Sequence, residues 1–191
     1  MPATASRVKR PARRKIGAPP TIPKAVGVRK RPATQPHPIA YIPGMGIDDF
    51  VNRVVYATPD LLIETERLGV PGAFFKDLSR RMNLPSVRVF AMLGVPKATV
   101  EKKAVSGSHI TGSGGYAAIG IAKLLGMVNA IVDETTAAKP PGFDAAKWLG
   151  AWLEKPQPAL GGRKPGDMID TPTGMEVVAK LLGSIASGAY Q

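Results

Sequence analysis

The segment that decides the fold is FDAAKWLGAWLEKPQPALGGRKPGDMIDTPTGMEVVAKLLGSIASGAYQ, which runs from Phe143 to Gln191. It follows the turn-forming run Lys139-Pro140-Pro141-Gly142 and contains both tryptophans of the chain. Asp144 is placed to cap a helix, because its side chain can accept hydrogen bonds from the first free amides. The spacing i, i+1, i+4, i+5 predicts that this helix has one apolar face, made of Trp148, Leu149, Trp152 and Leu153.

Proline and glycine divide the rest of this segment. Pro156 and Pro158 end the first helix, and residues 160–165 form a loop in which Pro165 opens a short helical turn. Thr171 then caps a last helix with Pro172 at its first position. Val178, Leu181, Leu182 and Ile185 give this helix an apolar stripe. Gly188 ends it and leaves Ala189-Tyr190-Gln191 as a free tail.

These motifs together resemble the C-terminal toxin-binding domain of Xre/MbcA/ParS-type antitoxins. The resemblance consists of F-x-x-A-x-W-L, then P-x-P-A-L-G-G-R-x-P, then T-x-x-G-x-x-x-V-x-x-L-x-x-x-I-x-x-G. The matching residues are Phe143, Ala146, Trp148, Leu149, Pro156, residues 158–163, Pro165, Thr171, Gly174, Val178, Leu181, Ile185 and Gly188. The resemblance covers the last quarter of the chain strongly and residues 74–134 more loosely.

The resemblance implies a partner toxin of the RES-domain type, which consumes NAD or transfers ADP-ribose. It also implies that the last helix and the tail block the NAD cleft of that toxin. Tyr190 and the carboxylate of Gln191 suit a pocket for an aromatic ring and phosphates. The predicted toxin-binding residues are Arg163, Lys164, Lys180, Ser184, Ser187, Tyr190 and Gln191. Two alternatives stay open: Arg163 caps carbonyls inside the domain, and the tryptophans only pack it.

The charge of the chain is unevenly distributed. The net charge is +12, yet residues 41–191 hold sixteen basic and fourteen acidic side chains. Residues 1–40 hold ten basic residues, eight prolines and no acid. We expect residues 1–38 to be disordered, because such a segment cannot bury enough surface to offset its chain entropy. It is either an arm that contacts nucleic-acid phosphates or a solvated leader without a partner.

The composition also excludes several classes of protein. There is no Cys, and the two histidines, His37 and His109, are too far apart to suggest a metal site. We therefore expect no metal and no cofactor. No run of eighteen apolar residues predicts a membrane span, and the N-terminus lacks a signal-peptide pattern. The acids lie scattered at helix caps and turns, so no catalytic set is assembled and we expect no enzyme. These features suggest a cytoplasmic protein.

Order is expected to begin near Ile39, followed by three helices. Asp48 is the predicted cap of the first helix, Thr58-Pro59 begins the second, and Gly69 follows its end. Pro71-Gly72 opens the third, which ends near Asn83 and carries its apolar side chains on one face. These side chains are Phe74, Phe75, Leu78 and Met82.

Residues 85–105 have the pattern of a helix-turn-helix. A helix over 86–93 is followed by Gly94 at the tight turn, Val95 between the helices, and a second helix that starts at Pro96. Its predicted DNA-binding face consists of Lys97, Thr99, Lys102 and Lys103. The alternative is an ordinary helical hairpin with a solvated lysine face. The resemblance implies a degenerate Xre-like helix-turn-helix.

Between these units we expect a loop over 106–115, with Ser113 as a helix cap, and a long apolar helix from Tyr116 to Val132. This helix suits buried packing or a dimer face, and residues 133–142 link it to the last segment. No stretch alternates long enough for a strand, so we predict an all-α protein. Its predicted parts are the basic tail 1–38, a helical domain over 39–138 for helix-turn-helix and dimerisation, and a toxin-binding domain over 143–191.

The sequence therefore predicts an antitoxin that neutralises a RES-type toxin and represses its own operon by binding operator DNA. A homodimer within a larger complex is expected. The alternative function is a DNA-binding transcriptional regulator without a toxin partner, whose C-terminal segment serves dimerisation.

Overall fold

The structure is a computed structural model that describes residues 37–135 and 142–186. The predictions for the basic tail before His37, for the centre of the linker and for the residues after Ala186 lie outside the described residues. Among the described residues, Ile39 is the first buried hydrophobic residue. Its side chain is buried and its amide donates a hydrogen bond to Thr65 Oγ1 at 2.9 Å.

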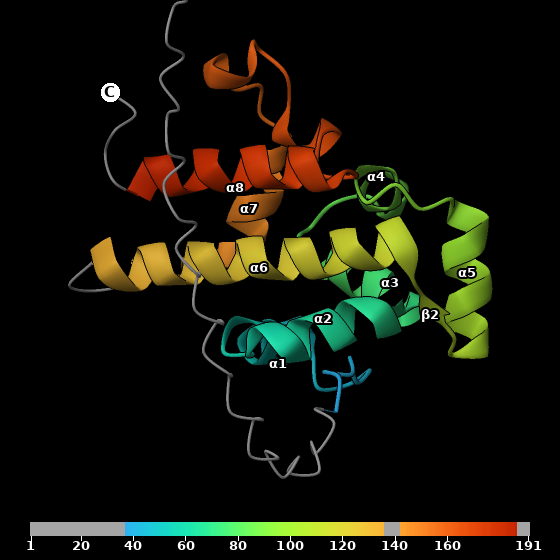
Figure 1. Ribbon diagram of the computed structural model, residues 1–191. Helices are drawn as coiled ribbons and strands as arrows, with labels where there is room; N and C mark the ends of the chain where they lie inside the picture. The colour runs from blue at the N-terminus through green and yellow to red at the C-terminus, as the bar shows by residue number, and fades with distance from the viewer. Residues whose placement is uncertain (1–36, 136–141, 187–191) are drawn as a thin grey trace, which may run out of the picture. The chain divides into compact units, whose positions relative to one another are not determined.

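The described residues form an α-helical protein, which confirms the predicted fold class (Figure 1). The one departure from it is a pair of two-residue antiparallel strands that places Val70 opposite Ile110. The elements are α1 (Ile47–Val55), α2 (Pro59–Leu68), β1 (Val70–Pro71), α3 (Gly72–Arg81), α4 (Ser86–Met92), α5 (Lys97–Ser106), β2 (His109–Ile110), α6 (Gly112–Thr135), α7 (Ala145–Leu153), the 3-10 turns η1 (Pro158–Leu160) and η2 (Pro165–Asp167), and α8 (Pro172–Ala186).

Helix α6 is the centre of the fold. Figure 1 shows α1 and α2 on one side of it and α7 and α8 on the other, and all four helices contact it. Two of its glycines permit this close packing. A Cβ at Gly120 would lie 2.5 Å from Met175 Cε of α8, and one at Gly126 would lie 2.2 Å from Val55 Cγ2 of α1. A larger side chain at either position would force Met175 or Val55 to move.

Helix α6 is also long and apolar enough to cross a membrane by length and composition alone, with a mean hydropathy of 1.6 over Gly112–Glu134. The sequence analysis, which counted only uninterrupted apolar runs, did not detect this. However, 61% of that stretch is buried inside the protein. Packing against four neighbouring helices explains the apolar composition, so α6 is a core helix.

An aromatic cluster fills the space between α1, α3 and the segment that precedes α1. Tyr41 meets Phe50 and Phe74 edge to face, at centroid distances of 5.7 and 5.2 Å, and Phe74 meets Phe75 in the same way. Edge-to-face contact brings the positive ring edge to the negative ring face. The Tyr41 hydroxyl donates to Asp77 Oδ2 at 2.5 Å, so its polar end is satisfied. This cluster begins the core that continues along α6.

Several predicted helix starts are wrong by a few residues. Asp48 is not the cap of α1, because Gly46 holds the N-cap position and Asp48 lies in the first turn. Ser113 is not a cap either, since α6 already begins at Gly112 and the predicted loop over 106–115 holds the end of α5, β2 and the start of α6. The pairing of β2 with β1 gives this glycine-rich stretch a defined structure. The paired residues are forty positions apart, so the local sequence does not reveal the contact.

Helices α4 and α5 lie where the sequence predicts a helix-turn-helix, and they contact each other. Gly94 adopts a φ of 64° at the turn, the left-handed conformation that favours glycine. Val95 lies buried between the two helices, and Val100 of α5 is fully buried. The inner faces of α4 and α5 therefore belong to the core, while none of the other described elements covers the outer face of α5. In Figure 1, α5 lies at one end of the molecule.

Candidate partner-binding surfaces

The loop between α7 and α8 is a compact structure built by short-range hydrogen bonds. The Gln157 amide donates to Arg163 O at 3.0 Å, and the Gly162 amide donates to Gln157 O at 3.0 Å. Gly161 has a φ of 64° with open space around it, so the chain reversal rather than packing requires glycine there. The segment Ala159-Leu160-Gly161-Gly162-Arg163 thus closes on itself and exposes its turn.

The start of α8 explains the T-x-x-G part of the motif. The Gly174 amide donates to Thr171 Oγ1 at 3.1 Å, which confirms the predicted cap. A Cβ on Gly174 would lie 1.8 Å from Met168 O, so only glycine fits beside this carbonyl. Thr171 and Gly174 therefore fix the direction in which α8 leaves the loop.

Two arginines of the preceding helices hold the segment that contains α7 and α8. Asp144 caps α7 as predicted, since its Oδ1 accepts from the amides of Ala146 and Lys147 at 3.1 Å each. The same carboxylate pairs with Arg81 of α3, which also pairs with Asp48 of α1 at 3.0 Å. Helices α1, α3 and α7 therefore meet at one guanidinium group.

The second arginine is Arg88 of α4. Its Nε donates to Glu154 Oε1 at 2.6 Å and its other end pairs with Asp167 of η2. Lys164 completes the network by donating to Glu154 Oε2 at 3.0 Å. Partial burial alone would raise the pKa of Glu154, but the hydrogen bonds from Lys164 and Arg88 hold that pKa below its ordinary value. The sequence analysis missed both arginines, because ion pairs across more than sixty residues leave no local signal.

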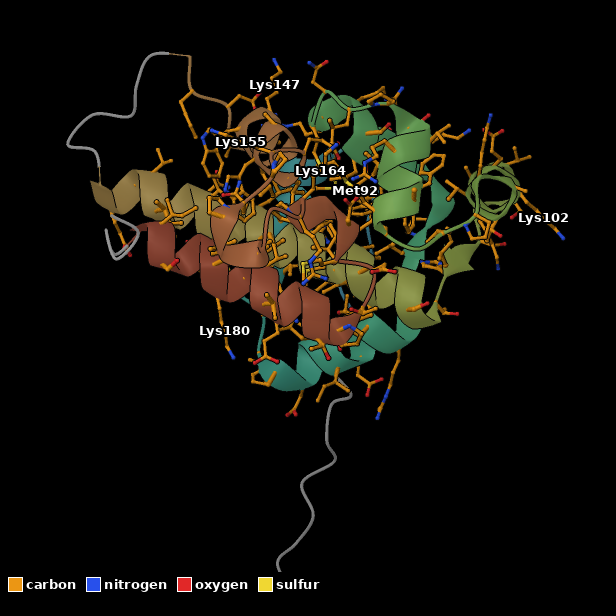
Figure 2. The ribbon with its side chains drawn as sticks, turned by 90° about the horizontal axis from the view of Figure 1, so that it is seen from above. Met92, Lys102, Lys147, Lys155, Lys164 and Lys180 are labelled. Atoms are coloured by element: carbon orange, nitrogen blue, oxygen red, sulfur yellow. The ribbon has the colours of Figure 1, made fainter. Side chains whose placement is uncertain are left out.

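The predicted toxin-binding residues that the structure describes are divided between the loop after α7 and helix α8. Lys164 donates a hydrogen bond to Glu154. Arg163 donates a hydrogen bond from Nε to Leu160 O at 3.2 Å, which is a contact inside the domain, as the capping alternative for Arg163 expects. Lys180 pairs with Glu176 at 2.8 Å on the exposed side of α8. Figure 2 shows Lys164 and Lys180 at different parts of the molecule. Ser184 donates to Leu181 O at 2.7 Å. Ser187, Tyr190 and Gln191 lie outside the described residues.

Helix α8 has one buried face and one exposed face. Met175, Val178, Leu181 and Leu182 are buried against the core. The opposite side exposes Thr173, Glu176, Val177 and Lys180, and Val177 is a large apolar side chain with 37% exposure. We call these four residues the α8 outer face. No other described element covers this side of α8, so it is accessible to a partner.

The tryptophans of α7 stack on each other, with ring centroids 6.1 Å apart and planes inclined by 8°. Trp152 is buried, so for this residue the packing alternative is correct. Trp148 is partly buried against the same core. The pair therefore stiffens α7 from inside the domain.

The predicted DNA-binding residues divide into two groups. Lys97 and Lys102 are exposed on α5, and Figure 2 shows Lys102 pointing away from the body of the protein. Thr99 and Lys103 are only half-exposed, because they lie beside the face that packs on α3. The spacing in the sequence did not distinguish these two groups. The prediction also omitted Ala98 and Glu101, which are exposed next to Lys97 and Lys102. Over residues 37–135 and 142–186, no group of three potential ligands could hold a metal ion.

Comparison with known proteins supports the same assignment. Residues 143–188 match the family described as the antitoxin Xre/MbcA/ParS C-terminal toxin-binding domain. A protein of Sphingobium sp. (strain YBL2), named "Prs ADP-ribosylating antitoxin", is 34% identical over 148 residues, which cover 77% of this chain and 92% of that protein. The segment that matches the family contains α7, the compact loop and α8. The chain therefore belongs to the Xre/MbcA/ParS antitoxin family and is the antitoxin of a toxin–antitoxin system.

Proposed function

We propose that this antitoxin neutralises a RES-type toxin that consumes NAD or transfers ADP-ribose. The name of the Sphingobium relative contains the term ADP-ribosylating, which fits a toxin of this class. The observation that carries the proposal is the α8 outer face, which none of the described elements covers, while the opposite side of α8 packs on α6. The alternative of a regulator without a toxin partner is disfavoured by the match to a toxin-binding domain.

The proposed mechanism is obstruction of the NAD cleft. A helix fixed by its cap at Thr171 and by its buried face loses little entropy when it docks. In this proposal the outer face lies against the toxin, and the residues that follow it, up to Tyr190 and Gln191, enter the cleft. An aromatic ring suits a pocket with an apolar base and a polar rim.

A titration of the toxin tests this mechanism. The toxin encoded beside this reading frame is assayed for NAD turnover with full-length antitoxin and with antitoxin that ends at Gly188. We expect the shortened protein to inhibit more weakly, because loss of an aromatic anchor often costs about 2 kcal/mol or more of binding free energy. A Lys76→Ala variant, altered on α3 away from α8, serves as the control and should match the full-length protein. Superimposable curves for the two lengths would exclude insertion of the tail.

We further propose that the protein represses its own operon in the cytoplasm through α5, as a homodimer. Lys97 and Lys102 support this, because both are exposed and neither forms an ion pair with any described residue. Cations that have no protein partner are available to phosphates. A homodimer would present two such helices to a two-fold symmetric operator.

A further inference from the structure

Helix α5 has an exposed face that its packing role does not explain. Lys97, Ala98, Glu101 and Lys102 are all exposed, and they occupy positions one, two, five and six of the helix. Val100 on the opposite side is fully buried. In a helix-turn-helix, the N-terminal residues of the second helix contact base edges in the major groove. The exposed residues of α5 are therefore the ones that would face DNA.

Glu101 has no structural task among the described residues. It forms neither an ion pair nor a hydrogen bond there, although Lys97 stands one helical turn before it, at the spacing that allows an ion pair. It also lies beyond the first turn of α5, so the helix dipole gives its negative charge no support. An acid between two cations weakens attraction to phosphates, so Glu101 does not contribute to sequence-independent binding of DNA.

The chemistry of base edges supplies another role for Glu101. In the major groove, cytosine presents an amino group at N4, and a carboxylate can accept a hydrogen bond from it. The lysines on either side of Glu101 can reach phosphates or guanine, and the short side chain of Ala98 lets the helix approach the bases closely. At a site with cytosine in this position, the carboxylate of Glu101 gains a hydrogen bond. At other DNA sequences it is only repelled by the phosphates. Such a difference produces specificity without adding general affinity.

We propose that Glu101 is a specificity-determining residue that recognises cytosine in the operator through its exocyclic amino group. The proposal rests on the operator-binding function proposed above. It assigns the two roles on α5 to different residues: Lys97 and Lys102 supply affinity for the backbone, and Glu101 supplies preference for sequence. Lys103, which is half-buried beside α3, belongs to neither group.

The test compares two DNA duplexes of equal length and composition, one from the promoter of the protein's own operon and one with the same bases shuffled. Affinities for both are measured for the wild type and for Glu101→Ala, at one fixed salt concentration. We expect Glu101→Ala to bind the shuffled duplex more tightly, because a repulsive charge is lost. The same substitution should lower the ratio of the affinity for the promoter duplex to the affinity for the shuffled duplex by roughly five- to hundredfold.

Two further variants sharpen the test. Glu134→Gln removes one exposed acid from α6, far along the chain from α5, and should leave the ratio unchanged. Glu101→Gln keeps the length of the side chain but pairs best with adenine. Among promoter duplexes in which single base pairs are replaced, it should therefore prefer adenine at one position where the wild type prefers cytosine.

Each contrary outcome has a definite meaning. If Glu101→Ala raises both affinities equally and the ratio stays constant, Glu101 only repels DNA and this proposal is wrong, while operator binding stands. If the wild type does not distinguish the promoter from the shuffled duplex, operator recognition itself fails and this proposal fails with it.

Discussion

At the scale of single residues, Asp144 combines two tasks that are usually separate. Its carboxylate caps α7 through two backbone amides and also pairs with Arg81 of α3. The first task is visible in the sequence, because an acid before an apolar periodic run is a common helix start. The second is not, because Arg81 lies more than sixty residues away. One side chain thus links a local helix signal to the packing of α7 on the rest of the protein.

Replacing Asp144 by alanine should therefore destabilise the protein by more than an average cap. Loss of a cap alone costs roughly 0.5–2 kcal/mol, and here Arg81 also loses one of its two carboxylates. Urea unfolding measures the change as a lower midpoint at constant slope. The control is Asp133→Ala, an exposed acid for which no ion pair is formed with any described residue. Equal midpoints for the two variants would show that the capping contact contributes nothing.

The same carboxylates predict how stability depends on pH. For both Asp144 and Glu154, burial raises the pKa, but hydrogen bonds from arginine and lysine outweigh it and hold the pKa below the ordinary values of 3.8 and 4.5. A carboxyl group whose pKa is lower in the folded state than in the unfolded state stabilises the protein at pH values above the unfolded-state pKa. This stabilisation is lost as the pH falls through the folded-state pKa. We expect the unfolding temperature to fall as the pH drops below about 4.5. In the Glu154→Gln variant this fall should be shallower, whereas an unchanged profile would argue against the network.

At the scale of elements, the helices were predicted well where the signal is local. Thr58, Pro59 and Gly69 bound α2 as predicted, because a cap, a first-turn proline and a following glycine act within a few residues. Helix α6 was predicted too short at its N-terminal end. Its first turn contains Gly112, Gly114 and Gly115, which disfavour a helix by themselves. A Cβ at Gly115 would lie 2.7 Å from Ile110 O, so this glycine is required by the approach of β2.

If DNA binding belongs to α5 and toxin binding to α8, changes on α5 should affect DNA binding alone. Reversing Lys97 and Lys102 to glutamate should abolish binding to the promoter, because phosphates then meet two acids in place of two cations. Toxin neutralisation should survive, since α8 is untouched. The control is the reversal of Lys147 and Lys155, two exposed lysines at the two ends of α7, with promoter binding as the readout. If this control weakened promoter binding as much as the α5 variant, the DNA surface would not be confined to α5.

At the scale of the whole molecule, the two predicted helical segments share one hydrophobic core. Residues from α1 to α6 and from α7 to α8 belong to the same buried cluster. Arg81 and Arg88 add ion pairs between the two segments. The division at residues 138 and 143 remains a prediction about which segment meets which partner. Toxin binding and DNA binding are therefore proposed for different helices, α8 and α5, that are joined to one core.

The basic N-terminal segment gives a prediction at this scale. Removing residues 1–36 should leave the unfolding temperature unchanged, because the core begins at Ile39. It should make promoter affinity less dependent on salt, since fewer phosphates would be neutralised. A longer deletion through Ile42 removes Ile39 and Tyr41, and loss of one large buried side chain typically costs about 2–5 kcal/mol. If the shorter deletion destabilised the protein as much as the longer one, the prediction of a tail outside the fold would be wrong.

The sequence by itself determined the helical class, most helix bounds, the caps at Asp144 and Thr171 and the family signature in residues 143–188. The helix bounds and caps depend on residues within a few positions of one another, so their physical cause lies in the local chain. The tertiary structure alone decided that α6 is a core helix, that Lys164 is bound to Glu154, and that Lys103 lies beside α3 while Glu101 faces solvent. Exposure and charge pairing depend on what folds against a residue, and those neighbours come from distant parts of the chain.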